Sequence, residues 1–229
     1  MNFRRSYALL PVVAVLLLAA AGEPKYQYLE GGGADFKSIL AAPPVDGSAE
    51  QLAEIDQLLH WQAQRTPEEA QRCKTEETSD AFIFAGVLGK AFNAHDLPAT
   101  AQLLENACAD ANAIVNTVKK DYDRKRPPAA DARIHPCVTA QMSSSYPSGD
   151  ATRGVVVATI LAQIFPDQQK QLMDLGKQIG DDRALAGMHY PSDVAAGQKL
   201  GAAIAAKIIA SSKFQADLEK ARTECKTVH

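Results

Sequence analysis

The sequence predicts an all-α, single-domain fold. Aromatic residues make up only 6% of the 229 residues, and no stretch alternates apolar and polar residues as a half-buried strand does. Alanine, a strong helix former, is abundant, and several stretches join a helix-starting residue to apolar residues at helical spacing. A hydrophobic content of 46% is enough for one substantial core, and the sequence has no internal repeat or second domain.

The first 21 residues have the pattern of a secretory signal peptide. Arg4 and Arg5 precede an apolar run over residues 8–18, and three alanines at 19–21 form a small-residue cleavage site. An uncleaved membrane anchor is the disfavoured alternative, because a spanning helix needs about 20 apolar residues. No second run is long enough to span a membrane. The sequence therefore predicts a soluble protein, periplasmic or secreted, without stable membrane insertion.

Residues 22–46 are rich in glycine and proline, and we expect an extended N-terminal arm that lies on the domain or is loosely tethered to it. Residues 47–229 are expected to form the helical domain. Helices are predicted over residues 48–64, from 66 onward, 79–92, 99–122, 150–164, 166–177 and 192–207, followed by a charged tail of helical tendency. Residues 131–147 are expected to be a loop, and residues 180–188 a short segment.

Some predicted helices carry specific packing expectations. In the third, Phe82, Val87 and Phe92 can face inward, and Gly86 and Gly89 would allow close helix contact. The long helix has one apolar stripe, made of Leu103, Leu104, Ala107, Ile114 and Val118. In the helix predicted to be capped by Ser192, Gly197 and Gly201 would permit close packing.

Four cysteines are widely spaced: Cys73, Cys108, Cys137 and Cys225. The absence of a CxxC pair argues against a structural zinc site. In an oxidising compartment an even number favours two disulfides, with three pairings that the sequence does not separate, over four free buried thiols. The net charge of −3 gives no support to nucleic-acid binding, which calls for a strongly basic face.

Three clusters between residues 119 and 193 carry groups suited to phosphate chemistry. Such chemistry needs positive charge on the phosphoryl oxygens, an in-line nucleophile and a proton for the leaving group. Lys119 and Arg126 lie about two helical turns apart, so both can face one side of a helix end. Taken alone, this segment reads better as a solvated basic face, because Lys120, Arg124 and Lys125 crowd it.

The other two clusters are a turn and a histidine. Ser148 and Gly149 precede a predicted helix and would offer a hydroxyl and backbone N–H groups to an anion, although Pro-Ser-Gly turns are common. His189 comes shortly before a helix that has Asp193 in its first turn. A carboxylate on one imidazole nitrogen would fix the tautomer and leave the other nitrogen free to attack. A lone histidine is more often an ordinary residue, so neither cluster is decisive by itself.

Together the clusters match a composite pattern: Lys-x6-Arg-Pro, then Pro-Ser-Gly-His, then Ser-Arg-x5-His-x3-Asp. By this pattern the chain is identified as a member of the type 2 phosphatidic acid phosphatase superfamily. The spacing fits throughout, over Lys119 to Arg126-Pro127, Pro147-Ser148-Gly149, and Arg183 to His189 to Asp193. The tyrosine before the turn and the run 189–194 resemble the exported class A bacterial nonspecific acid phosphatases. The motifs cover about a third of the chain.

That resemblance implies a helical bundle of the superfamily's kind and hydrolysis of small phosphomonoesters, with transfer to alcohols as an added reaction. It implies His189 as the nucleophile that forms a phosphohistidine and Asp193 as the residue that orients it. The implied phosphate ligands are Lys119, Arg126, Ser148, the Gly149 backbone and Arg183. No metal or other cofactor is implied, and phosphate and vanadate are expected to bind the site as inhibitors. A homo-oligomer is left open.

The chain departs from the family pattern at two positions. Asp182 stands where a serine usually precedes the arginine, which we expect to be a change behind the site. Asp150 stands where the family has the histidine that protonates the leaving alcohol. An unperturbed aspartate, with a pKa of about 3.9, is mostly ionised near neutrality, although burial beside phosphate can raise that pKa. His60, His95 and His135 could in principle supply the proton, but their spacing places none of them in the pocket.

Several functions stay open at this point. The leading interpretation is an exported acid phosphatase with Asp150 as the acid; the alternatives are an impaired or variant enzyme, or a non-catalytic phosphate binder. A vanadate-dependent haloperoxidase is disfavoured because those chains are generally longer. A membrane lipid phosphatase is disfavoured by the lack of spanning segments.

Overall fold

The structure is a computed structural model that describes residues 25–29 and 36–228. The predicted signal peptide lies outside the described residues. Within them every regular element is helical, which confirms the all-α prediction. The elements are α1 (Ala49–Gln64), α2 (Pro67–Thr78), η1 (Ala81–Phe84), α3 (Ala85–Leu88), α4 (Pro98–Tyr122), α5 (Pro127–Ala130), α6 (Gly149–Ile164), η2 (Pro166–Gln168), α7 (Gln169–Leu185), α8 (Pro191–Ile209) and α9 (Ser212–Val228). No described helix is both long and apolar enough to cross a membrane.

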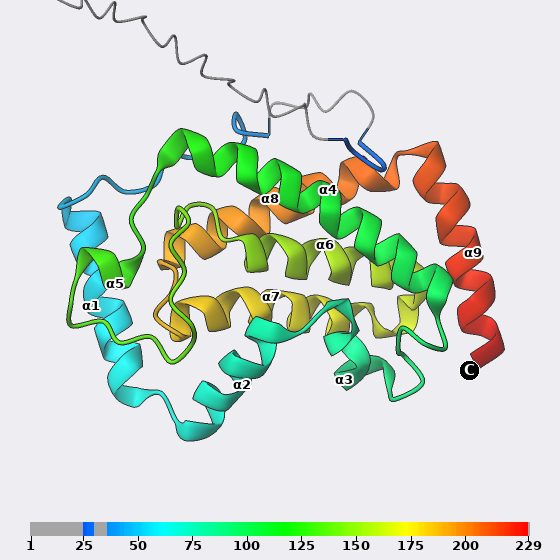
Figure 1. The fold of residues 1–229 in the computed structure, drawn as a ribbon, viewed down its shortest axis with the longest axis horizontal. Helices are drawn as coiled ribbons and strands as arrows, with labels where there is room; N and C mark the ends of the chain where they lie inside the picture. Colours follow the sequence, from blue (N-terminus) through cyan, green and yellow to red (C-terminus); the bar gives the residue numbers. More distant parts are fainter. Residues whose placement is uncertain (1–24, 30–35, 229) are drawn as a thin grey trace, which may run out of the picture.

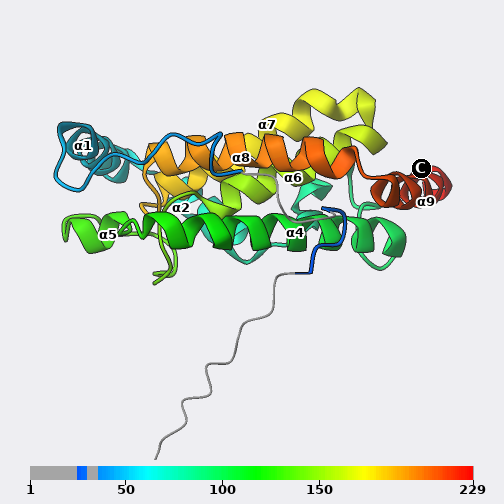
Figure 2. The same cartoon turned by 90° about the horizontal axis from the view of Figure 1, so that it is seen from above.

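Helix α6 is the centre of the bundle. Figure 1 shows α4 and α7 on opposite sides of α6, and Figure 2 shows α8 on the side of α6 away from α4. Both views show α1 and α9 at opposite ends of the molecule. The α4 stripe faces this core as predicted, since Leu103, Leu104, Ala107, Ile114 and Val118 are all buried. Burying apolar surface in this way supplies most of the stabilisation of such a bundle.

Glycines set how closely the neighbouring helices approach α6. A Cβ placed on Gly197 would lie 2.4 Å from the carbonyl oxygen of Ser148, and one on Gly201 would lie 2.5 Å from that of Thr152. Both expectations for α8 are therefore confirmed. On the other side, a Cβ on Gly176 of α7 would lie 2.6 Å from the carbonyl oxygen of Gly154.

The prediction of one helix over residues 79–92 was wrong. Asp80 accepts from the N–H of Phe82 and begins η1, and α3 ends at Leu88 because the next residue, Gly89, has a φ of +87° that does not continue a helix. Neither Gly86 nor Gly89 makes a close helix contact, because a Cβ on either would meet nothing within 4 Å. Phe92 is buried as expected, whereas Phe82 and Val87 are only half-buried.

Two further boundaries differ from prediction. Helix α7 does not stop near residue 177 but continues through Gly180 to Leu185, since Gly180 packs closely on Ala151 of α6. Helix α8 is capped at Tyr190 rather than Ser192, because the Asp193 carboxylate accepts from the Tyr190 N–H at 2.9 Å. As a result, the C-terminal end of α7 and the N-terminal end of α8 lie on either side of His189 in the chain.

The described part of the arm lies on the domain. Tyr28, Leu29, Phe36 and Leu40 are buried in the main core. The Asp110 carboxylate on α4 accepts from the backbone N–H groups of residues 27, 28 and 29 at 2.6, 2.8 and 3.1 Å. Of the two arrangements expected for this segment, the structure therefore has the packed one.

All four cysteines are free thiols in the structure, so the predicted disulfides stay a prediction. Cys73 of α2 lies near Cys137 of the loop before α6, and burial together with nearby groups that include Cys137 raises the pKa of Cys73. Cys225 instead lies 3.5 Å from the Thr100 hydroxyl.

Candidate active site

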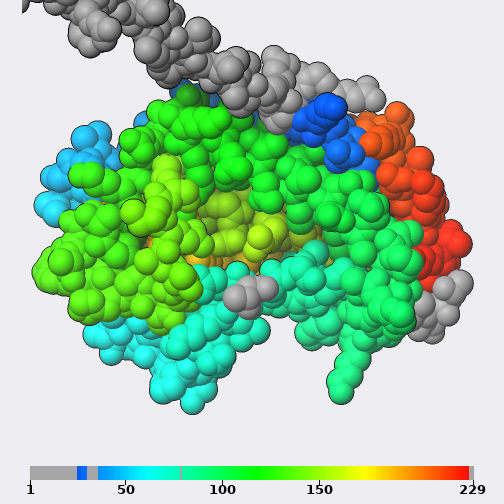
Figure 3. Space-filling model, in the orientation of Figure 1, coloured from blue at the N-terminus to red at the C-terminus, as the bar shows by residue number. Residues whose placement is uncertain are grey.

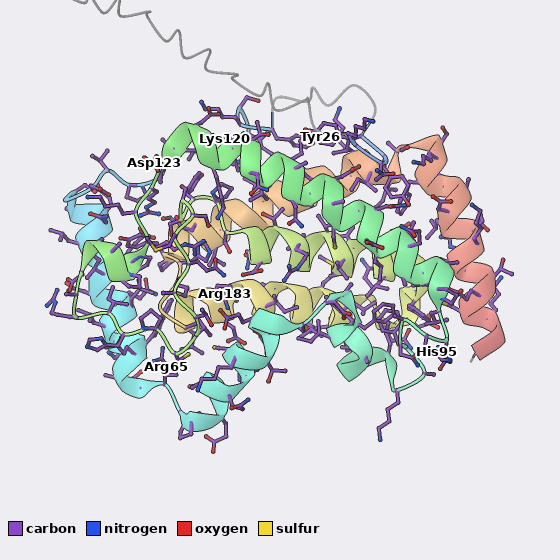
Figure 4. The ribbon with its side chains drawn as sticks, viewed as in Figure 1. Tyr26, Arg65, His95, Lys120, Asp123 and Arg183 are labelled. Carbon is purple, nitrogen blue, oxygen red and sulfur yellow. The ribbon has the colours of Figure 1, made fainter. Side chains whose placement is uncertain are left out.

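The three predicted clusters converge where α4, α6, α7 and α8 meet. Lys119 lies in the last turn of α4, Arg126 just after it, and Ser148 caps α6. Arg183 lies in the last turn of α7, and His189 and Asp193 flank the start of α8. In Figure 4, Arg183 lies toward the left end of the bundle, beside the loop that follows α4.

His189 is fully enclosed, with 1% of its surface exposed. Its Nδ1 lies 3.4 Å from Asp193 Oδ2 and from the Ser145 hydroxyl, and Arg126 donates to its Nε2 at 2.9 Å. These partners assign the proton to Nδ1 and the lone pair to Nε2. Burial lowers the pKa of His189 to about 4, although Asp193 opposes the shift. The imidazole is therefore neutral through most of the acid range.

Asp193 is fully buried, and its two oxygens have different partners. Oδ2 accepts from the Ser145 hydroxyl at 2.5 Å and from the Tyr190 N–H at 2.9 Å, and faces His189. Oδ1 accepts from Arg124 at 2.6 Å. Burial alone would raise the pKa of Asp193, but His189, Arg124 and Ser145 outweigh it and the pKa lies below its usual value. Asp193 is thus an ionised partner for the imidazole.

Two cations, Lys119 and Arg126, reach toward His189 from the α4 side. Lys119 donates to the Ser144 carbonyl at 2.7 Å, and Arg126 donates to the carbonyls of Ser143 and Met188. Burial, together with the charge of Arg126, lowers the pKa of Lys119 to about 8. Lys119 is therefore charged at acid and neutral pH. The basic stretch is only partly a solvated face, because Lys120 and Lys125 are exposed whereas Arg124 and Arg126 are each only 5% exposed.

Arg183 is the most enclosed of the cations, with 1% of its surface exposed. Neither Nη1 nor Nη2 has a hydrogen-bond partner among the described residues. Buried polar groups are almost always paired, and a guanidinium fork suits the oxygens of phosphate. An unsatisfied buried guanidinium beside Lys119, Arg126 and His189 is the feature expected of an anion site.

Asp150, in the first turn of α6, faces the same cations. Its Oδ2 lies 3.0 Å from Nε of Arg183, and its Oδ1 accepts from Arg153 at 3.0 Å. Burial would raise the pKa of Asp150, but Arg183 and Arg153 outweigh it and hold the pKa below its usual value. Asp150 is therefore an anion in the free protein, bound to a group that the resemblance assigns to substrate.

Ser148 and Gly149 lie at the start of α6 as predicted. The buried Ser148 hydroxyl accepts from the Ala151 N–H, and the Ser148 N–H donates to the Asp193 carbonyl at 3.0 Å. The first backbone N–H groups of a helix, here those of Gly149 and Asp150, have no partner within the helix. They add to the positive character of the site.

None of the other histidines considered as proton donors lies in the site. His60, His95 and His135 are exposed, and Figure 4 places His95 at the opposite end of the bundle from Arg183. Asp182 points away from the site and binds Arg72 through both oxygens, at 2.6 and 2.8 Å.

Sequence reasoning missed three residues of the site: Glu54, Arg124 and Ser145. Glu54 comes from α1, more than 60 residues upstream of the first cluster, so no local spacing links it to the others. The charged run around Arg124 favours a solvated basic face, and Ser145 lies in a stretch that the sequence predicts to be a loop. Of the three, only Ser145 carries a signal in the sequence, because it lies three residues before Ser148 of the predicted turn.

The surface beside the site is hollowed. Figure 3 shows a depression between α4 and the α2–η1 segment, with yellow-green residues of α6 at its floor. A groove of about 580 Å³ on this face is lined by residues of η1 and α4, including Phe82, Leu104 and Asn112, and by Arg153 of α6. Because Arg153 also binds Asp150, the groove reaches the edge of the site.

Comparisons with known proteins agree with this geometry. Residues 101–216 match the PAP2 superfamily model. The chain is 29% identical over 219 residues to a non-specific acid phosphatase of Providencia stuartii (88% of this chain, 86% of the relative). It is 30% identical over 196 residues to an acid phosphatase of Zymomonas mobilis (81% and 73%). A non-specific acid phosphatase of Salmonella typhimurium is 32% identical over 149 residues, and that match spans only 60% of its length.

Among solved structures, a transmembrane PAP2-type phosphatidylglycerolphosphate phosphatase from Bacillus subtilis has a similar fold. The TM-score is 0.53 over 71% of this chain and 85% of that one, at 17% identity. At this identity the likeness concerns the fold alone. With the family match over Lys119 to Asp193 and the relatives above, the chain belongs to the PAP2 superfamily, in the branch of the class A bacterial non-specific acid phosphatases.

Proposed function

We propose that the protein is an exported acid phosphatase that hydrolyses small phosphate monoesters through a phosphohistidine on His189. The observation that carries the proposal is His189 itself. The imidazole is buried and neutral, its Nδ1 faces Asp193, and its Nε2 points toward Arg126 among the cations that suit a phosphoryl group. The names of its relatives support the same activity.

In the first step Nε2 of His189 attacks phosphorus and the bond from phosphorus to the ester oxygen breaks. Arg126 must give up its hydrogen bond to Nε2 for this step, and its fork then turns to the phosphoryl oxygens with Lys119 and Arg183. Asp193 stabilises the positive charge that develops on the imidazole. The departing alkoxide takes a proton from the carboxyl group of Asp150.

In the second step a water molecule attacks the phosphohistidine. Asp150, now a carboxylate, takes the proton of that water, and the bond from nitrogen to phosphorus breaks to release phosphate. An alcohol in place of water would receive the phosphoryl group instead. No step calls for a metal, and vanadate and phosphate should compete for the same cations.

Asp150 makes the first step pH-dependent. The phosphoryl anion competes with Asp150 for Arg183, and a like charge nearby raises the pKa of a carboxylate. Asp150 is therefore protonated in the complex only on the acid side. Substrates with good leaving groups need no such proton, and the rest should be hydrolysed only in acid.

A second candidate function is phosphate binding without turnover. The ion pair between Asp150 and Arg183 is the observation that favours it, since it sets an anion against substrate. Hydrolysis of p-nitrophenyl phosphate separates the two. We expect turnover by the intact protein and none by a His189→Ala variant, whereas a binder would give no turnover in either.

We also propose export to the periplasm or beyond, with removal of residues 1–21. In that compartment the contact between Cys73 and Cys137 would become a disulfide that ties α2 to the loop before α6. N-terminal sequencing of the exported protein tests the cleavage. Mass spectrometry of alkylated peptides tests the disulfide. Alkylation of both thiols without prior reduction would show that the disulfide does not form.

A further inference from the structure

Arg124 belongs to no motif of the site, yet its buried side chain is bonded to Asp193, Ser192 and Glu54. Only 5% of its surface is exposed, although it lies in a run of charged residues at the end of α4. Its Nη1 donates to Asp193 at 2.6 Å and to the Ser192 hydroxyl at 2.7 Å, and its Nη2 donates to Glu54 at 2.8 Å. Its guanidinium also lies over the Tyr190 ring, 3.9 Å from the centroid.

The backbone of Arg124 is fixed as well. Its N–H donates to the Ser144 hydroxyl and its carbonyl accepts from the Ser145 N–H at 2.8 Å. Ser145 in turn donates to Oδ2 of Asp193. One residue therefore holds Oδ1 of Asp193 directly and holds the donor to Oδ2 through the backbone.

Glu54 connects this arrangement to α1. Its side chain is 13% exposed, and it accepts from Arg124 through Oε2 and from the Ser192 N–H, at 2.7 Å, through Oε1. The result is a row of alternating charges: Glu54, Arg124, Asp193 and then the imidazole of His189. Such paired charges are oriented far more firmly than a lone buried carboxylate would be.

We propose that Arg124, anchored by Glu54, is a positioning residue that keeps Asp193 aimed at His189 and keeps the His189–Asp193 pair from binding an extra proton in acid. The proposal deepens the function proposed above and rests on it. A cation within ~4–6 Å of a carboxylate disfavours protonation of that carboxylate and of any group coupled to it. Without Arg124, the pair would take up a proton at a higher pH, whichever of the two holds it, and attack by Nε2 would be lost.

Other charges also face the pair and must be counted. Lys119 of α4, Arg126 after it and Arg183 of α7 oppose protonation, and Asp150 of α6 favours it. None of these touches Asp193 Oδ1, the oxygen that Arg124 holds. Removing Arg124 therefore changes the charge nearest to Asp193 and leaves the phosphate ligands in place.

Variants of Arg124 and Glu54 should shift the acid limb of the pH profile in opposite directions. We expect Arg124→Gln to move the acid limb of kcat/KM for p-nitrophenyl phosphate to higher pH by about one unit or more. Arg124→Lys, which keeps the charge, should restore most of that shift. Glu54→Gln removes an anion and leaves Arg124 to act on Asp193 alone, so its acid limb should move to lower pH. Arg222→Gln, at the far end in α9, removes an arginine bonded to the Gln163 carbonyl and should move neither limb.

Titration of the His189 imidazole by NMR reads the same equilibrium without turnover. This measurement does not depend on activity. If the protein does not hydrolyse the substrate, the proposed function is wrong, but the effect of Arg124 on the titration of His189 can still be measured. Shifts of opposite sign in Arg124→Gln and Glu54→Gln support the inference. A purely structural role gives lower stability and lower kcat in both with an unmoved acid limb, and that result overturns it. If Arg124→Gln does not fold, Glu54→Gln decides, and a His189 titration that does not move to lower pH in that variant overturns the inference.

Discussion

The Asp150 carboxylate lies 3.0 Å from Nε of Arg183, a cation that the superfamily pattern assigns to the phosphoryl group. The protein thus carries an internal anion at the place where we propose that the phosphoryl group of the substrate binds. Two consequences are separable: competition with phosphate, and the supply of a proton to the leaving group. Different substitutions at residue 150 isolate them.

Asp150→His tests the supply of the proton. The imidazole can donate over a wider pH range than a carboxyl group, so turnover of alkyl phosphates should rise by roughly 10²-fold or more near neutrality, the usual size of general acid catalysis. Turnover of p-nitrophenyl phosphate, whose leaving group needs no proton, should change far less. Equal gains on both substrates would remove Asp150 from the acid role.

Asp150→Asn tests the competition. It removes the charge, keeps the size and frees Arg183, but it supplies no acid. Inhibition by inorganic phosphate should tighten about tenfold, or ~1.4 kcal/mol, without any gain on alkyl phosphates. Unchanged inhibition would mean that Asp150 and phosphate do not compete for Arg183.

The pH profile for p-nitrophenyl phosphate should be bounded by His189 and Lys119. His189 attacks only when neutral, so kcat/KM should rise as pH increases through its pKa of about 4. Lys119 binds phosphate only when charged, so kcat/KM should fall as pH increases through its pKa of about 8. Lys119→Arg should move the falling limb to higher pH, since arginine stays protonated. An unmoved limb, after correction for the ionisation of the substrate, would assign it to another group.

Gly197→Ala should damage the site from behind. The added Cβ would lie 2.4 Å from the Ser148 carbonyl, so the turn that holds Ser148 and Gly149 must move. We expect a loss of about 1–3 kcal/mol in unfolding free energy, with weaker phosphate binding. Gly86→Ala is the matched control, because its Cβ would meet nothing and alanine favours helix. If both variants behave alike in denaturant titrations, close packing at Gly197 does not hold the turn.

Asp110→Ala should release the N-terminal arm. Three backbone N–H groups lose their acceptor, for an expected cost of about 1–3 kcal/mol in unfolding free energy. Asp121→Ala, which breaks an exposed ion pair with Lys37, should cost under about 1 kcal/mol. Limited proteolysis should cut the arm sooner in the first variant than in the second. Equal rates would show that Asp110 does not hold the arm down.

The elements that sequence pattern predicted well are those in which local signals and tertiary packing agree. Ser48 caps α1 and Thr66 caps α2 where expected, and the α4 stripe faces the core. The misplaced ends of α7 and α8 have one cause: local signals that tertiary packing overrides. Gly180 reads as a break, but α6 approaches so closely that only glycine fits in a continuing helix. Ser192 reads as a cap, but its N–H and hydroxyl are bound by Glu54 and Arg124.

In the site, too, sequence spacing predicts some contacts, whereas others depend on how the helices pack. The residues of the composite pattern come together, because their spacing within the chain reflects the helix ends that position them. The ion pair between Asp150 and Arg183, separated by 33 positions, depends on how α6 and α7 pack, and no spacing announces it. Glu54 and Arg124 are joined across 70 positions in the same way.

The most direct test of the account is to trap the phosphorylated enzyme. The protein is mixed with p-nitrophenyl phosphate that carries radioactive phosphorus, and the reaction is stopped within one turnover. Alkali is used to stop it because a phosphorus–nitrogen bond survives base. We expect label on the peptide that contains His189, and none in the His189→Ala variant. Turnover without label on His189, or full turnover by His189→Ala, would contradict it.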